Sequence, residues 1–108
     1  MNVFIGSGKI INIAKTVSTN NGKIRILRFT VAATCKHNPD NDKNKTDLIP
    51  CIIYNPSKDL EDWFLKQGQD SYVEFEGRVV TFTFELIGEK TCKTEVVVNS
   101  RSLNIMLL

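Results

Sequence analysis

Residues 94–99 of this 108-residue chain read Thr94-Glu95-Val96-Val97-Val98-Asn99, a run dominated by β-branched valines. Such residues favour extended backbone, so the run predicts a β-strand near the end of the chain. Two further blocks precede it, Thr46-Asp47-Leu48-Ile49-Pro50-Cys51-Ile52-Ile53-Tyr54 and Glu76-Gly77-Arg78-Val79. Each block alone is typical of an ordinary core strand, and the information about the fold lies in their order and spacing.

The first third of the chain also has strand and turn signals. Residues 3–13 predict a long first strand, and Gly6 and Gly8 within it indicate a bend. Residues 20–22, Asn-Asn-Gly, predict a hairpin turn because these residues tolerate positive φ. Residues 24–34 alternate strictly, which predicts a core face of Leu27, Phe29, Val31 and Ala33 and a solvent face of Arg28, Thr30, Ala32 and Thr34.

A polar segment and a short helix occupy the middle of the chain. Residues 35–45 contain almost no apolar side chains and predict a long loop before a third strand over residues 47–54. A helix is predicted to follow, with Asn55 or Ser57 as its N-cap and its end at Gly68.

Residues 71–87 and 91–98 predict the last two strands, with a turn at Gly88 between them. The expected fold is therefore all-β, with five strands and one short helix between the third and the fourth strand.

Composition indicates one ordinary globular domain over residues 1–108, with 42% hydrophobic and 24% charged residues. No stretch approaches the roughly 18 apolar residues that a membrane span needs. The first residues lack the basic and apolar regions of a signal peptide. We therefore expect a cytoplasmic protein that does not contact membranes.

Charge is distributed unevenly along the chain. Residues 1–45 carry eight basic and two acidic residues, a net charge of +6, whereas residues 46–108 carry six basic and ten acidic residues, a net charge of −4. This asymmetry indicates one face suited to a polyanion such as nucleic acid. The alternative is that the charges are scattered over solvated strands.

The residues that could carry other chemistry are few. Cys35, Cys51 and Cys92 are odd in number and widely spaced, which argues against a disulfide framework and a zinc site. The chain has one histidine and no nucleophile elbow, Walker-type loop or spaced carboxylates suited to Mg²⁺. We expect neither catalysis nor a metal or other cofactor.

The three blocks quoted above, in this order, resemble bacterial single-stranded DNA-binding proteins, and the resemblance covers nearly all 108 residues. It implies an oligonucleotide-binding barrel (OB-fold) of five strands that binds single-stranded DNA by stacking bases on aromatic rings and tracking phosphates with Lys and Arg. It also implies roles in DNA replication, repair and recombination.

Carrying the family's stacking positions onto this chain gives His37, Leu48, Tyr54 and Phe84. Leu48 offers only an apolar contact where the family usually has a ring, so the resemblance implies weaker binding per domain than in the family's main replication members. The basic residues expected to contact phosphates are Lys9, Arg28, Lys36, Lys43, Lys45 and Arg78, with Arg28 the firmest candidate because it lies on the outward face of its strand.

Four of the aromatic or histidine side chains have alternative roles. Phe84 belongs to an apolar series whose spacing also suits the core or a subunit contact, and the ring of Tyr54 can pack inward while its hydroxyl stays at the rim. His37 borders a polar loop and can be merely solvated. Trp63 is expected on the helix, closing the barrel end, with base stacking as the alternative.

Family members usually continue beyond the barrel into a disordered segment with an acidic tip, which this sequence does not contain. A short member, or a chain cut after the barrel, accounts for this, and the apolar ending is expected to pack on the barrel or on a neighbouring subunit. The resemblance further implies a homo-oligomer, a tetramer first and a dimer second. The alternative function is that of a primosomal-type adaptor acting mainly through replication or restart proteins, and RNA is the alternative nucleic acid.

Overall fold

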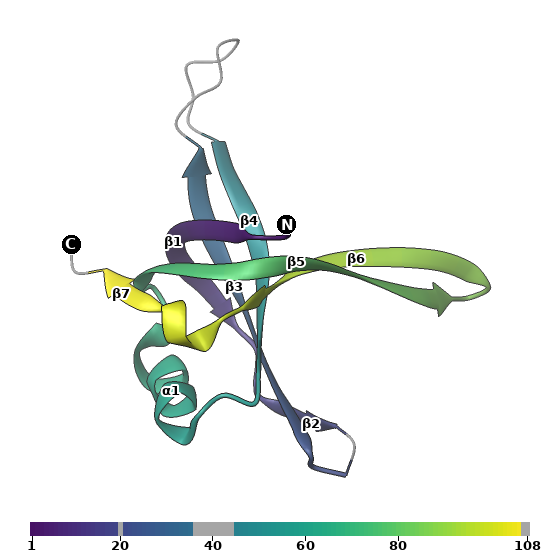
Figure 1. The fold of residues 1–108 in the computed structure, drawn as a ribbon, viewed down its shortest axis with the longest axis horizontal. Helices are drawn as coiled ribbons and strands as arrows, with labels where there is room; N and C mark the ends of the chain where they lie inside the picture. Colours follow the sequence, from purple (N-terminus) through teal and green to yellow (C-terminus); the bar gives the residue numbers. More distant parts are fainter. Residues whose placement is uncertain (20, 36–44, 107–108) are drawn as a thin grey trace.

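The computed structural model describes residues 1–19, 21–35 and 45–106. Figure 1 shows the chain as two long β-ribbons joined to a small barrel, with the helix below. In chain order the elements are β1 (Phe4–Ile13), β2 (Val17–Thr19), β3 (Ile24–Cys35), β4 (Lys45–Tyr54), α1 (Lys58–Trp63), a π-helical turn η1 (Phe64–Gly68), β5 (Tyr72–Leu86), β6 (Glu89–Val98), a 3₁₀ turn η2 (Ser100–Ser102) and β7 (Asn104–Met106).

Five of the strands close into a ring. The order is β1-β3-β4-β6-β5, and β5 pairs back onto β1 to complete the barrel. The β4–β6 pair is parallel and the other pairs are antiparallel. The all-β, five-stranded barrel predicted from the sequence is confirmed, and so is one short helix.

β1 serves two partners in succession, which is how the ring closes. Its first half pairs with β5 as far as Lys9, which lies opposite Tyr72, and its second half pairs with β3 from Lys9 onward. At the crossing point a Cβ atom on Gly8 would lie 2.3 Å from the carbonyl oxygen of Ala32, so only glycine allows the two backbones to approach this closely. The bend predicted from the glycines of the first strand is located here.

The core lies on the predicted inner face of β3. Leu27, Phe29 and Val31 are buried, and they pack with residues of the other barrel strands in one cluster. The helical segment closes the end of the barrel, because Phe64 is fully buried and its ring lies 4.7 Å from that of Phe29. Trp63 packs against the same cluster, as the sequence predicts.

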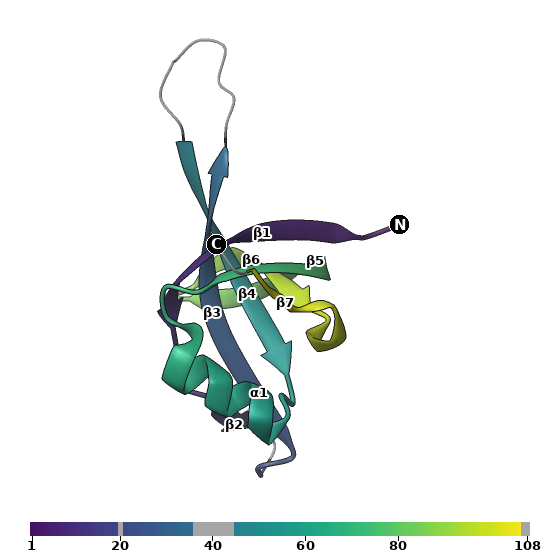
Figure 2. The same ribbon diagram turned by 90° about the vertical axis from the view of Figure 1, so that its left-hand side faces the viewer.

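The helix begins as one of the two predicted caps requires. Ser57 is the N-cap, and its hydroxyl oxygen accepts a hydrogen bond from the backbone N–H of Leu60 at 3.2 Å. Figure 2 shows this helix at the lower end of the barrel. No helix in the described ranges is long and apolar enough to cross a membrane.

Two short strands were not predicted. β2 pairs with the start of β3, and the turn between them has positive φ at Asn21 and Gly22, as the predicted hairpin requires. The helix lies between β4 and β5, which are the third and fourth of the five barrel strands in chain order, as predicted; only the extra strand β2, which is outside the ring, shifts the numbering. β7 pairs with the start of β5, so residues 104–106 of the apolar ending pack on the barrel, one of the two expected outcomes.

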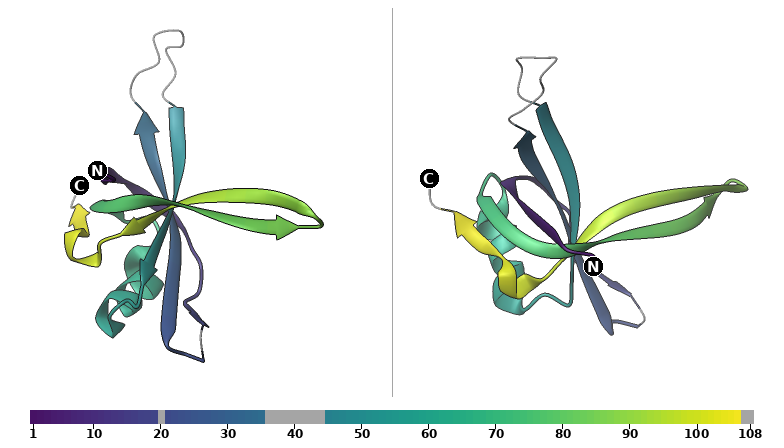
Figure 3. Two further views of the ribbon diagram at one scale, coloured as in Figure 1. Left: turned by 45° about the vertical axis from the view of Figure 1, so that its right-hand side comes forward. Right: turned by 45° about the horizontal axis from the view of Figure 1, so that its top comes forward.

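Two hairpins extend beyond the barrel in different directions (Figure 3). One is formed by β3 and β4, and the loop predicted within residues 35–45 lies largely outside the described residues. The other is formed by β5 and β6 and turns at Ile87 and Gly88, both with positive φ. Long hairpins of this kind supply surface well away from the core.

Candidate nucleic-acid interface

Strand register places most of the predicted binding residues on one side of the sheet. Arg28 on β3 pairs with Ile52 on β4, Ile52 with Val97 on β6, and Val97 with Arg78 on β5. Paired residues share a face and alternate residues of a strand do so too. The surface thus defined is called the outward face, and its members include Arg28, Thr30, Ala32, Leu48, Pro50, Ile52, Tyr54, Arg78, Val80, Phe82, Phe84, Lys93, Glu95 and Val97.

The apolar binding candidates on the outward face are open to solvent. Leu48 lies on the β3–β4 hairpin, Tyr54 at the barrel end of β4, and Phe84 on the β5–β6 hairpin. All three are exposed, and Phe84 retains 41% of its accessible surface. The chain's own core therefore does not use Phe84, which removes one of its two alternative roles.

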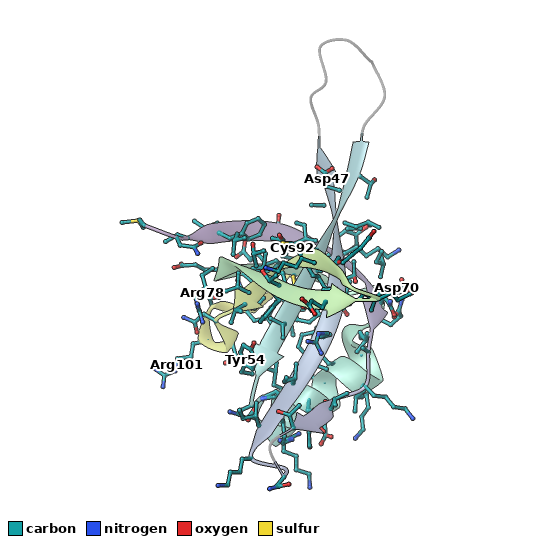
Figure 4. All side chains as sticks on the ribbon, turned by 90° about the vertical axis from the view of Figure 1, so that its right-hand side faces the viewer. Asp47, Tyr54, Asp70, Arg78, Cys92 and Arg101 are labelled. Atoms are coloured by element: carbon teal, nitrogen blue, oxygen red, sulfur yellow. The ribbon has the colours of Figure 1, made fainter. Side chains whose placement is uncertain are left out.

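The basic candidates differ in whether their charge is already paired with an acidic side chain. Arg78 is exposed and makes no ion pair with a residue in the described part of the chain. Lys9 lies beside Ala32 on the same side of the sheet and pairs with the exposed carboxylate of Asp70 at 3.6 Å, an interaction that solvent weakens. Figure 4 shows Arg78 on the same side of the molecule as Tyr54 and Arg101.

Arg28 is not the free cation that the sequence suggests. Its Nε atom lies 3.3 Å from Oε2 of Glu95, whose side chain is only 3% exposed. The other carboxylate oxygen of Glu95 lies 3.9 Å from Nζ of Lys93. Two cations therefore flank one buried anion in the middle of the outward face, and the cluster carries a net charge of +1.

A surface hollow of about 190 Å³ opens beside this cluster. Its polar lining comes from Asn12 and Thr30 as well as from the three charged residues Arg28, Lys93 and Glu95. Below it, burial and, secondarily, the negative charge of Glu95 raise the pKa of the Cys51 thiol to about 12. Cys51 is consequently a protonated core side chain and not a nucleophile.

Four of the predicted residues cannot be assigned to this face. Lys36, His37 and Lys43 lie outside the described residues, and so does the side chain of Lys45, whose backbone opens β4 opposite Cys35. Their proposed roles stay predictions. Within the described ranges, no group of His, Cys, Asp or Glu side chains is arranged to hold a metal ion.

Several outward-face residues were missed by sequence reasoning. Phe82 lies two residues from Phe84 on the same side of β5, opposite Lys93 on β6, and it is similarly exposed. The two-residue spacing of the phenylalanines was a usable signal for a second exposed ring. The position of Lys93 depends on the pairing of β6 with β5, and the burial of Glu95 depends on its contact with Arg28. Neither can be recognised from a local sequence pattern.

Comparisons with known proteins agree with this architecture. No family model matches the chain. A single-stranded DNA-binding protein of Onion yellows phytoplasma (strain OY-M) is 33% identical over 58 residues, which are 54% of this chain and 49% of that protein. The match thus spans about half the length of this curated relative.

A solved structure described as a Plasmodium falciparum SSB complex with ssDNA superposes over 100% of this chain and 95% of its own, with a TM-score of 0.76 and 18% sequence identity. The fold is therefore that of the oligonucleotide-binding barrel. Within this class, the chain is similar in sequence and in structure to single-stranded DNA-binding proteins, and the resemblance stated from the sequence is confirmed.

Proposed function

We propose that this chain binds single-stranded DNA with little sequence preference, on the outward face. The observation that carries the proposal is the register, which brings Leu48, Tyr54 and Phe84 onto the same face as Arg28 and Arg78 although they come from three separate strand blocks. Similarity to proteins named for binding single-stranded DNA supports the same ligand.

The binding mode follows from the chemistry of this face. Exposed rings offer flat apolar surfaces to bases, and a stack of one base on one ring contributes ~1–3 kcal/mol whatever the base. Arg78 and the cluster around Arg28 attract the phosphates, with affinity that falls as salt rises. A duplex hides its bases within the stack, so it cannot use the rings.

The test is fluorescence anisotropy of labelled oligo-dT, with a duplex of equal length as the control, at low and at moderate salt. We expect tight, salt-sensitive binding of the single strand and weak binding of the duplex. Equal binding of both, or no binding at low salt, would refute the proposal and favour the adaptor role acting through other proteins. An oligo-rU probe of the same length reports whether RNA competes for the face.

The proposal extends to assembly and location. A homotetramer, with a dimer as the alternative, suits the exposed apolar residues Ile5 on β1 and Val3 just before it. Roles in replication, repair or recombination in the cytoplasm, with replication or restart proteins as partners, belong to the same proposal. Sedimentation equilibrium of the purified chain measures the subunit number.

A further inference from the structure

The most unusual group on the outward face is an acid. Glu95 is the one buried charged residue among those described, and it lies where a polyanion is proposed to bind. Resting on the proposed function, we propose that the hollow beside Arg28 and Lys93 is a subsite for backbone phosphates, and that Glu95 limits the number of phosphates this subsite neutralises by cancelling half of its positive charge.

The geometry favours a phosphate at this point. The side chains of Arg28 and Lys93 are 41% and 53% exposed, whereas that of Glu95 is 3% exposed. An approaching strand therefore meets two cations, with the carboxylate behind them. Arg28 engages Glu95 through Nε, and its two terminal nitrogens make no hydrogen bond with another described residue, so they can form a bidentate contact with phosphate oxygens.

Charge at the hollow determines how much the subsite contributes. The two cations and one anion give a net charge of +1, enough to neutralise about one phosphate. Removing the carboxylate charge would raise this to +2 without changing the surface that the strand touches, because Glu95 is buried.

Counterion release converts this difference into a measurable slope. For single strands, each phosphate neutralised steepens the dependence of log K on log[salt] by about 0.7. If one further phosphate is neutralised, the affinity at about 0.1 M salt rises about fivefold, because K scales with the salt concentration to the power of about −0.7.

The experiment compares Glu95→Gln with the wild type by anisotropy of labelled oligo-dT across a salt series. Glutamine keeps the shape and an acceptor oxygen for Arg28 while removing the charge. The matched control is Glu85→Gln, which removes the same charge from the opposite side of the β5–β6 hairpin. We expect Glu95→Gln to bind about fivefold more tightly with a slope steeper by about 0.7, and Glu85→Gln to leave the slope unchanged.

Each outcome is decisive. An unchanged slope with weaker binding in Glu95→Gln would show that Glu95 is only structural and would overturn the inference. If circular dichroism shows that this variant is unfolded, Lys93→Gln decides instead, because Lys93 is exposed and its loss should make the slope shallower by about 0.7. An unchanged slope in Lys93→Gln overturns the subsite. Failure of the wild type to bind any single strand would overturn the proposed function itself.

Discussion

Truncation of Phe84 to alanine tests whether the β5–β6 hairpin contributes a base-stacking platform. The ring is 41% exposed, lies opposite Thr91 on β6 and is absent from the core cluster. Its removal should therefore cost the fold little, of the order of a cross-strand pair, ~0.2–1 kcal/mol.

The effect on binding should be much larger. Loss of one stacked base costs ~1–3 kcal/mol, which corresponds to about 5- to 150-fold weaker binding of oligo-dT. The change to leucine keeps apolar area but removes the flat ring, so Phe84→Leu should recover only part of this loss. If Phe84 instead serves a subunit contact, leucine should retain most of the wild-type behaviour and alanine should lower the subunit number.

The assay is anisotropy of labelled oligo-dT at fixed salt, with thermal unfolding and sedimentation of each variant. Thr83→Ala is the matched control, since Thr83 is the preceding residue on the opposite side of the same hairpin, paired with Cys92. Equal losses of affinity in the alanine variants of Phe84 and Thr83 would refute the assignment of the outward face. So would a change of subunit number in Phe84→Ala with unchanged affinity per subunit.

Three further changes test other parts of the structure. Leu48→Phe should strengthen oligo-dT binding about fivefold, ~1 kcal/mol, because it places a ring at an exposed apolar position; unchanged anisotropy titrations would remove Leu48 from the site. Gly8→Ala should lower the free energy of unfolding in urea by ~1–3 kcal/mol, because its Cβ would meet the carbonyl oxygen of Ala32 at 2.3 Å; a variant as stable as the wild type would contradict the crossing of β1. The pKa of Cys51 is raised from 9.0 to about 12, so the unfolded chain loses this proton first and the free energy of unfolding should fall by about 1.4 kcal/mol per pH unit between these values. In urea unfolding over the same pH range, the free energy of unfolding of Cys51→Ala should not show the decrease that is due to Cys51. If the free energies of the two proteins fall in parallel with pH, the raised pKa of Cys51 is refuted.

The barrel could be predicted because each of its strands has a recognisable local sequence pattern. The alternation in residues 24–34 gives the inner face of β3, and the buried Val96 and Val98 follow the same rule in β6. β2 could not be predicted, because its three residues are all exposed and it is ordered only by pairing with β3. A strand that forms through its partner leaves no hydrophobic period of its own.

The aromatic part of the site was predictable for a similar reason. Once the strand is recognised, two aromatic residues spaced two apart are predicted to share one face. This reasoning identified Phe84 and could also have identified Phe82. Burial of Glu95 is different in kind. It depends on Arg28, which lies 67 residues away in sequence, and a carboxylate in a strand is ordinarily read as solvent-exposed.

The uneven charge of the sequence illustrates why a linear count misjudges a surface. Basic residues of the first 45 positions meet acids of the second part in three ion pairs, Lys9 with Asp70, Arg25 with Glu61 and Arg28 with Glu95. Closure of the barrel thus brings the two halves against each other and cancels part of the asymmetry that indicated a polyanion. The positive charge available to a ligand then includes Arg78 and Lys93, which come from the acidic part of the chain.

Replacing Arg28 alone would leave the buried Glu95 without its nearest partner, and such uncompensated groups cost ~1–3 kcal/mol or more. A loss of binding in that variant would therefore mix affinity with stability, and variants of Lys93 and Glu95 separate the two.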